Sequence, residues 1–277
     1  MLKTKEEVTN STEDLILPKS RIIAYYGNLL SKKMGVLGEY PPNEMWRRLK
    51  IEASEWEAAD SATPVQVALH FVAVVANNDK GRDNKYITRM SDTLIDKVIS
   101  IAGMEKATIV FLDIQAGLAD VKSEVIRLDN YLRMPNIHLG IDPEFTMCNS
   151  GIPGKKIGCI THKEINSIIN YLSILVERHH IPPKILIIHS FIKQIIDNEK
   201  IKKSKNVQLV LNIDGWGNPE QKKSSYRRLT FEKHYFDYDY TGIKLFYKND
   251  LRHSPYRMLS KEEILSLDPK PLYVQYQ

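Results

Sequence analysis

The feature that most constrains the fold of this chain is a series of eight apolar runs, which begin near residues 21, 65, 107, 136, 184, 207, 241 and 271. The runs are rich in β-branched and aromatic residues, as expected for strands that are buried on both faces. Helical periodicity separates most of them. Eight strands that alternate with helices predict an α/β protein with a (β/α)8 barrel, the TIM-barrel architecture.

Length and composition agree with one barrel rather than two smaller domains. The chain has 277 residues, 43% of them hydrophobic, and a barrel of about 250 residues would use nearly all of them. We expect residues 1–20, which are polar, to form a loose N-terminal arm and residues 21–277 to form the barrel. Because the chain stops on the eighth run, the usual last helix is not expected, and the arm would cover that side or leave an exposed flank.

Charge and targeting signals narrow the possible partners. The net charge is +5, and the two basic runs, 202–205 and 222–228, are predicted to be solvated helix faces, since no stacking aromatics are interleaved with them. No nucleic-acid partner is therefore expected. No run approaches the ~18 apolar residues of a membrane span. Residues 1–20 carry no secretory signal, which leaves the localisation open between a cytoplasmic protein and one whose signal has been removed.

The two cysteines, Cys148 and Cys159, lack C-x-x-C spacing and a neighbouring histidine. The spacing therefore predicts neither a zinc site nor a redox motif, and it is compatible with a reducing compartment.

The fourth run, residues 136–145, ends in two carboxylates separated by one residue. Because alternate side chains of a strand point to the same side, Asp142 and Glu144 share a face with His138 and Gly140, while the other face is apolar. At the carboxyl end of a barrel strand this pair would open into an active site. Alternatively, Asp142 caps the next turn and Glu144 is solvated.

Asp113, His189 and Asp214 also follow apolar runs, the third, fifth and sixth. Acids that converge in one pocket raise each other's pKa, so that one carboxyl can stay protonated as a general acid while a neighbour is ionised. We therefore predict that the catalytic groups are Glu144, Asp142, Asp214 and Asp113. For His189 a structural role is an equal alternative, and His70, in the middle of the second run, is expected in the core.

The expected ligand contacts come from the rims of the same runs. Aromatic rings there could stack on sugar rings, or could simply pack the strand ends. Glu39 lies in a long loop after the first strand, where it contacts substrate or is solvated. The predicted substrate-binding residues are Tyr26, Glu39, His189, Trp216 and Tyr247.

An ordered set of segments resembles a poorly characterised bacterial family, common in actinobacteria and often carrying lipoprotein signals, that is described as glycoside-hydrolase-like TIM barrels. The segments are 23–28, 35–39, 112–115, 139–144, 212–217 and 273–277. The resemblance implies the barrel fold and no specific activity. Chitinase-type glycosidases end their fourth strand in D-x-x-D-x-D-x-E; here only Asp142 and Glu144 match, and Ile137 and Gly140 occupy the other acidic places.

Three functions remain open. The first is a glycosidase acting on a polysaccharide or glycan, with Glu144 as the proton donor and the aspartates as nucleophile, base or orienting groups. The second is a non-catalytic carbohydrate-binding or scaffolding barrel. The third is a metal-dependent hydrolase, in which the acids and His189 would hold a divalent ion; since neither H-x-H nor H-E-x-x-H occurs, no metal and no other cofactor are expected. The predicted partner is a carbohydrate or another small polar ligand.

Overall fold

A computed structural model describes residues 15–148, 150–192, 200–231 and 237–277 of the chain. The strands of this described part form one sheet. They are β1 (Arg21–Gly27), β2 (Val65–Ala76), β3 (Ile87–Arg89), β4 (Ile109–Ile114), β5 (Ile137–Ile141), β6 (Lys184–Ser190), β7 (Val207–Ile213), β8 (Tyr240–Leu245) and β9 (Tyr273–Tyr276).

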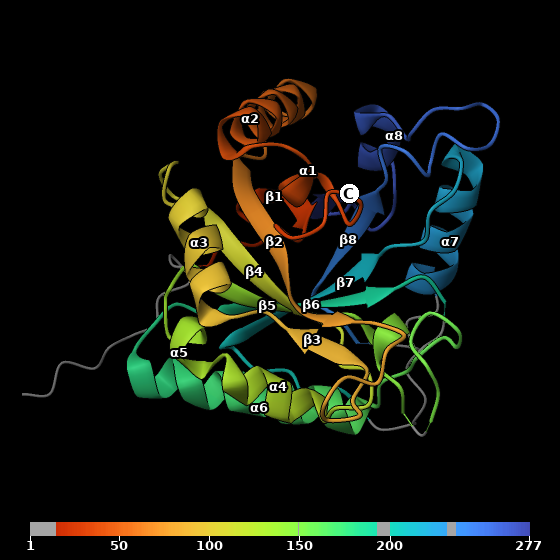
Figure 1. The fold of residues 1–277 in the computed structure, drawn as a ribbon. Coiled ribbons are helices and arrows are strands. Elements are labelled where there is room, and N and C mark those ends of the chain that lie inside the picture. Colours follow the sequence, from red (N-terminus) through yellow and green to blue (C-terminus); the bar gives the residue numbers. More distant parts are fainter. Residues whose placement is uncertain (1–14, 149, 193–199, 232–236) are drawn as a thin grey trace, which may run out of the picture.

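The sheet closes into a parallel barrel (Figure 1). The strand order is β1-β9-β8-β7-β6-β5-β4-β2-β3, and β1 also pairs with β2, so that eight strands form a ring. All pairs within the ring are parallel, whereas β3 extends β2 as an antiparallel strand outside it. Each of the eight apolar runs overlaps one strand of the ring, and the predicted TIM-barrel fold is confirmed.

Helices lie between the strands and surround the ring in Figure 1. They are α1 (Val36–Glu39), α2 (Pro42–Ala59), α3 (Asp92–Ala102), α4 (Val121–Arg127), α5 (Asp129–Leu132), α6 (His162–His179), α7 (Pro219–Phe231) and α8 (Lys261–Leu265), together with the 3-10 turn η2 (Pro143–Phe145). Ser91 caps α3, because its hydroxyl accepts a hydrogen bond from the Leu94 amide. A further helix expected around residues 195–196 lies outside the described residues.

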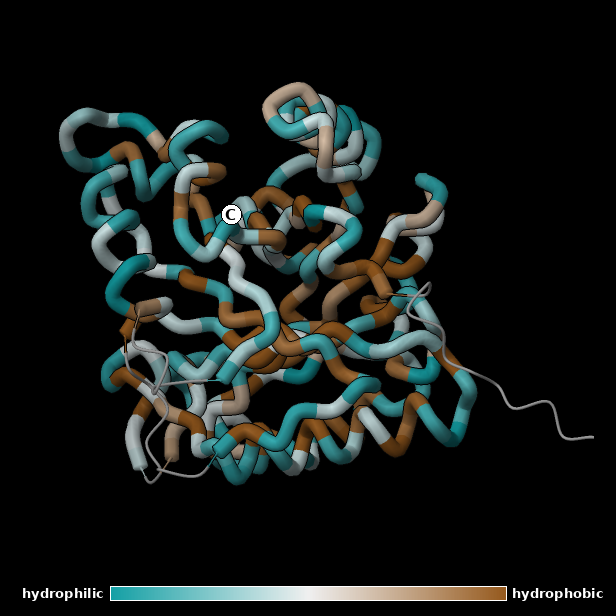
Figure 2. The backbone as a smooth tube through the Cα atoms, turned by 180° about the vertical axis from the view of Figure 1, so that it is seen from behind, coloured by the Kyte–Doolittle hydropathy of each residue, from teal (hydrophilic) through white to brown (hydrophobic). Residues whose placement is uncertain are grey.

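Alternation along the strands divides the apolar side chains into two layers. In β5, Ile137, Leu139 and Ile141 face outward and join the core between sheet and helices. A second cluster fills the barrel interior with inward residues of other strands, including Phe111 and Ile187. Figure 2 shows apolar residues concentrated along the central strands. The face of β5 that the sequence predicts to be apolar therefore packs against the helices.

The last residues of the N-terminal arm do not form a loose segment. Leu17 is fully buried in the cluster inside the barrel. Its carbonyl accepts a hydrogen bond of 2.6 Å from the side chain of Gln208 on β7. The expectation of a loose arm is therefore wrong for this part of it, because an apolar side chain is needed to fill the amino-terminal end of the barrel.

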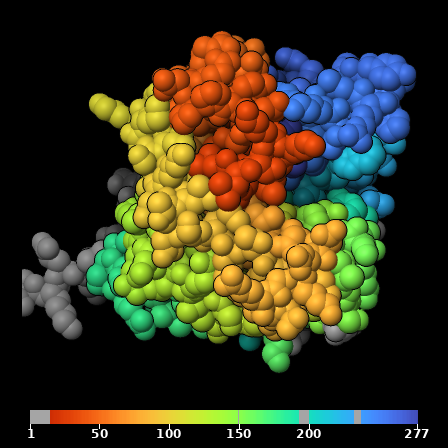
Figure 3. Space-filling view, in the orientation of Figure 1, coloured from red at the N-terminus to blue at the C-terminus, as the bar shows by residue number. Residues whose placement is uncertain are grey.

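No helix follows β9, as predicted, and the side that such a helix would cover is occupied by α2 and α8. Trp56 on α2 is fully buried, and its indole nitrogen donates a hydrogen bond of 2.9 Å to the hydroxyl of Tyr276 on β9. Figure 3 shows the red to orange residues of the amino-terminal segments beside the blue carboxyl-terminal ones. The flank beside β9 is thus covered by α2 and α8.

The two basic runs differ from the prediction. Residues 202–205 precede β7 without helical structure. Lys222 lies on α7, but it is buried and pairs with Asp250 at 3.3 Å, so only part of that run is a solvated helix face.

Cys148 and Cys159 form a disulfide in the loop that follows η2. The sequence did not indicate this bond, because two cysteines separated by 11 positions match no motif. None of the described helices is both long enough and apolar enough to cross a membrane.

Candidate functional site

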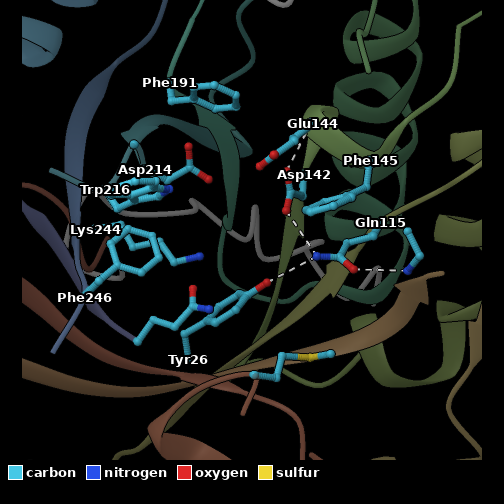
Figure 4. A pocket seen from close by; sticks show the side chains of 14 residues that line it. Tyr26, Gln115, Asp142, Glu144, Phe145, Phe191, Asp214, Trp216, Lys244 and Phe246 are labelled. Atoms are coloured by element: carbon cyan, nitrogen blue, oxygen red, sulfur yellow. Dashed lines mark hydrogen bonds between the residues drawn. The ribbon is translucent and has the colours of Figure 1, made fainter. Parts of the chain in front are cut away.

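A cavity of about 380 Å³ opens at the carboxyl ends of the barrel strands (Figure 4). Every strand of the ring, or the segment directly after it, contributes to its wall. The lining residues are Tyr26, Met34, Ala76, Gln115, Asp142, Glu144, Phe145, Phe191, Asp214, Gly215, Trp216, Lys244, Phe246 and Gln277. Since parallel strands bring their carboxyl ends to one rim, residues far apart in the sequence meet here.

Asp142 and Glu144 both line the cavity. The predicted strand is shorter than expected, since β5 ends at Ile141 and Glu144 lies in η2, so strand parity does not by itself place Glu144. Asp142 also caps η2, since its Oδ1 accepts a hydrogen bond of 3.2 Å from the Glu144 amide. Its Oδ2 accepts one of 3.2 Å from Gln115 Nε2. The capping role and the pocket role are therefore compatible, because the cap turns the chain so that Glu144 projects into the cavity beside it.

Burial raises the pKa of both carboxyls. Removal from water raises the pKa of Asp142 to about 8, and the charges of Asp214, Asp113 and Glu144 add to this effect while His189 opposes it. Glu144 is partly exposed, and burial followed by the charge of Asp214 raises its pKa to about 7. Both carboxyls thus hold a proton at a pH where an exposed carboxyl is ionised.

Asp214 lies on the opposite side of the cavity from Glu144, and both carboxylates extend into it (Figure 4). Asp214 Oδ2 is 3.2 Å from Nδ1 of His189. Burial disfavours a charge on His189, but Asp113 and Asp214 outweigh this effect and raise its pKa. His189 Nδ1 is therefore placed to hydrogen-bond with Asp214 below the cavity surface.

Lys244 is a cation of this site that the sequence analysis did not identify. It projects from β8 into the cavity, where its Nζ lies 3.6 Å from the centre of the Tyr26 ring. Burial lowers its pKa, although the surrounding acids, Asp214 first, oppose the shift. The available signal was a charged residue within the predicted strand 241–247, on the same side of the strand as Gly242.

Two predicted site residues, Asp113 and His189, lie beneath the cavity and do not line it. His70, expected in the core, is beside them inside the barrel. Asp113 Oδ1 is 3.5 Å from His70 Nε2 and 3.7 Å from His189 Nε2. Among the residues that the structure describes, these three side chains form a group that could hold a metal ion.

Aromatic rings form much of the cavity wall. Tyr26, Phe145, Phe191, Trp216 and Phe246 contribute to it, and Figure 4 shows them around the acids. Of the predicted ligand contacts, Tyr26 and Trp216 are therefore at the cavity. Trp216 is 53% exposed, so its ring is accessible to a ligand.

Glu39 and Tyr247 do not reach this cavity. They line a separate, smaller cavity of about 70 Å³. Glu39 pairs with Lys248 at 2.6 Å. The Tyr247 hydroxyl donates to Glu52 on α2 at 2.9 Å. The structure thus places both in contacts between the strand ends and the surrounding segments.

Comparison with models of known protein families gives no match to this chain, and no protein of curated function is significantly similar to it in sequence. Of what the resemblance to glycoside-hydrolase-like barrels implied, the structure confirms the TIM-barrel fold.

Proposed function

We propose that this protein is a glycoside hydrolase with Glu144 as its general acid. The observation that carries the proposal is a carboxyl with a pKa raised to about 7, facing Asp214 across an aromatic-lined cavity. Glycosidases need one carboxyl that is protonated and one that is ionised on either side of the scissile bond. The two carboxyls have different surroundings here, because Asp214 Oδ2 lies 3.2 Å from His189 Nδ1, whereas Glu144 has no such partner among the described contacts.

Each acidic residue has a separate role in the proposed reaction. Glu144 gives its proton to the glycosidic oxygen as the bond to the anomeric carbon breaks. Asp214 either attacks that carbon or removes a proton from the attacking water. Asp142 is held by Gln115 and by the Glu144 amide, so it orients Glu144 and keeps the surroundings of the acid polar. Asp113 is enclosed below the cavity and acts only through His189.

The aromatic wall supports a carbohydrate ligand. Sugar rings have apolar faces that pack on aromatic side chains, and small-molecule cavities combine such walls with a few polar groups. Trp216 stacks on His253 with ring centres 6.2 Å apart, which holds the indole while leaving it half exposed. The volume of about 380 Å³ lies within the usual range of small-molecule pockets.

The test is a screen of polysaccharides and aryl glycosides with the wild type, Glu144→Gln, Trp216→Ala and the control Glu39→Gln. Loss of the transferable proton in Glu144→Gln should lower kcat by about 10²–10⁴-fold, and Trp216→Ala should mainly raise KM. Wild-type kcat/KM should fall as the pH rises through about 7, where Glu144 loses its proton. Glu39→Gln should retain activity, since Glu39 lies outside the cavity.

Two results would contradict the proposal. Cleavage that is unchanged in Glu144→Gln would exclude Glu144 as the acid. Sugar binding without cleavage by the wild type would identify a non-catalytic carbohydrate-binding barrel.

A further inference from the structure

Three side chains with metal-ligand chemistry meet inside the barrel, below the cavity. His70 projects from β2, Asp113 from β4 and His189 from β6. One ligand atom from each lies within 4.8 Å of the other two. The side chains are at most 1% exposed, and none of them lines the cavity above.

The ligand atoms lack hydrogen-bond partners within the described part of the chain. These atoms are Nε2 of His70, Nε2 of His189 and both carboxylate oxygens of Asp113. Leaving buried polar atoms unsatisfied is costly, so several of them pointing at one spot indicate a missing partner. A metal ion would satisfy all of them together, because it accepts electron pairs from two imidazoles and a carboxylate at once.

The distances fit a metal ion better than direct hydrogen bonds. Asp113 Oδ1 is 3.5 Å from His70 Nε2 and 3.7 Å from His189 Nε2. A charge-assisted hydrogen bond would be about 2.7–2.9 Å long. Two ligands of a tetrahedral Zn²⁺ with bonds of about 2.0–2.1 Å are about 3.3–3.4 Å apart. The two distances to Asp113 are thus close to the spacing that coordination requires, and the three ligand atoms together lie within 4.8 Å of one another.

The second nitrogen of each histidine already has an oxygen partner. His70 Nδ1 is 2.7 Å from the hydroxyl of Tyr273, and His189 Nδ1 is 3.2 Å from Asp214 Oδ2. Metal-binding histidines typically use the second ring nitrogen in this way, which orients the ring and directs the lone pair of the other nitrogen to the ion.

Gly140 on β5 supplies space beside the cluster. A Cβ atom at this position would lie 2.5 Å from Asp113 Oδ1 and 2.8 Å from His70 Nε2. Real atoms do not approach so closely, so any side chain here would displace the ligands. The residue lies in a strand without a positive φ angle, so the glycine is required for space and not for its backbone conformation.

We propose that His70, Asp113 and His189 bind one divalent first-row transition metal ion, with Zn²⁺ as the best fit, and that Gly140 keeps room for the ion or a fourth ligand. The ion connects β2, β4 and β6 across the barrel interior. The proposal does not depend on glycosidase activity. It replaces the expectation of no metal, which rested on short motifs and therefore missed ligands that come from three separate strands.

The test measures metal binding by the full chain directly. Protein stripped with a chelator is titrated with Zn²⁺, and separately with Co²⁺, Mn²⁺ and Fe²⁺, in the presence of a weaker competing chelator that removes ions from surface histidines. We expect one tightly bound Zn²⁺ per chain, a higher Tm and, with Co²⁺, the strong visible absorption of a tetrahedral site. Tighter binding of one equivalent of Mn²⁺ or Fe²⁺ than of Zn²⁺ would support the metal site but identify a different ion.

Variants then locate the site. Loss of a residue that only supports a metal ligand typically weakens metal binding by about 10–100-fold. Asp113→Asn and His70→Gln should weaken Zn²⁺ binding by more than this. Gly140→Ala should also abolish binding although every ligand is retained. The matched control is His138→Asn, because His138 is another buried barrel histidine with an unpartnered Nε2, but it is outside the cluster.

Some outcomes would overturn the proposal. One is wild-type protein that binds no ion against the competing chelator, and this result holds even if the variants fail to fold. Another is full binding by folded Asp113→Asn. A third is equal loss in His138→Asn, which would show that any change in the barrel interior prevents binding.

Discussion

Replacement of Asp142 by asparagine tests the electrostatics of the cavity without any substrate. Burial raises the pKa of this carboxyl from 3.8 to about 8. The folded protein therefore keeps the proton until about pH 8, whereas the unfolded chain loses it near pH 4. Between these values unfolding releases a proton, so the wild type should lose stability as the pH rises. The asparagine variant has no such group.

The expected size follows from the difference in pKa. Each unit corresponds to about 1.4 kcal/mol, and about three of the four units are titrated between pH 5 and pH 9. The stability of the variant relative to the wild type should therefore rise by on the order of 4 kcal/mol over this range. A constant loss of about 1–3 kcal/mol is superimposed, since one amide oxygen cannot accept both from Gln115 and from the Glu144 amide.

The assay is urea denaturation of chelator-treated wild type and Asp142→Asn at several pH values from 5 to 9, with the free energy of unfolding as the readout. The stability of the variant relative to the wild type should be on the order of 4 kcal/mol higher at pH 9 than at pH 5, which makes the variant the more stable protein at pH 9. Asp79→Asn, which removes an exposed negative charge, is the control for the change in net charge.

A stability difference between wild type and Asp142→Asn that changes by less than ~1 kcal/mol across this pH range would refute the reasoning. It would mean that water or local rearrangement solvates the ionised carboxylate in the folded protein.

Two further substitutions test the packing that holds the barrel. Lys222→Met should lower the free energy of unfolding in urea by about 3–5 kcal/mol, because it leaves Asp250 buried without its cation. The control Lys223→Met, on the same helix, should lower it by at most about 1 kcal/mol. Equal losses in the two variants would contradict the burial of the Lys222–Asp250 pair. Leu17→Ala should lower the free energy of unfolding by about 2–5 kcal/mol, because it opens a cavity inside the barrel. The control Leu30→Ala, at a 73% exposed position, should have little effect on stability. A Leu17→Ala protein as stable as the wild type would show that Leu17 does not close the barrel.

The sequence alone determined the number of barrel strands and the face to which their side chains point. Strand residues alternate between two sides, so the apolar positions of 137–141 had to face the helices once the strand was identified. The same rule predicted one site for Asp142 and Glu144; both line one cavity, but the turn η2 that Asp142 caps places Glu144 there. Applied to 243–247, it would also have placed Lys244 inside the barrel and Tyr247 outside, because they have opposite parity.

The tertiary structure decided how deep each inward residue lies and what it meets there. Parity alone does not distinguish Asp113, below the cavity, from Asp142, at its surface; the register, which pairs Asp113 with Gly140, sets this difference. The burial of Leu17 and Lys222 was equally hidden, since their partners are distant in the sequence. Local patterns record which way a side chain points, whereas burial, pKa and the meeting of ligands depend on neighbours that only the closed barrel brings together.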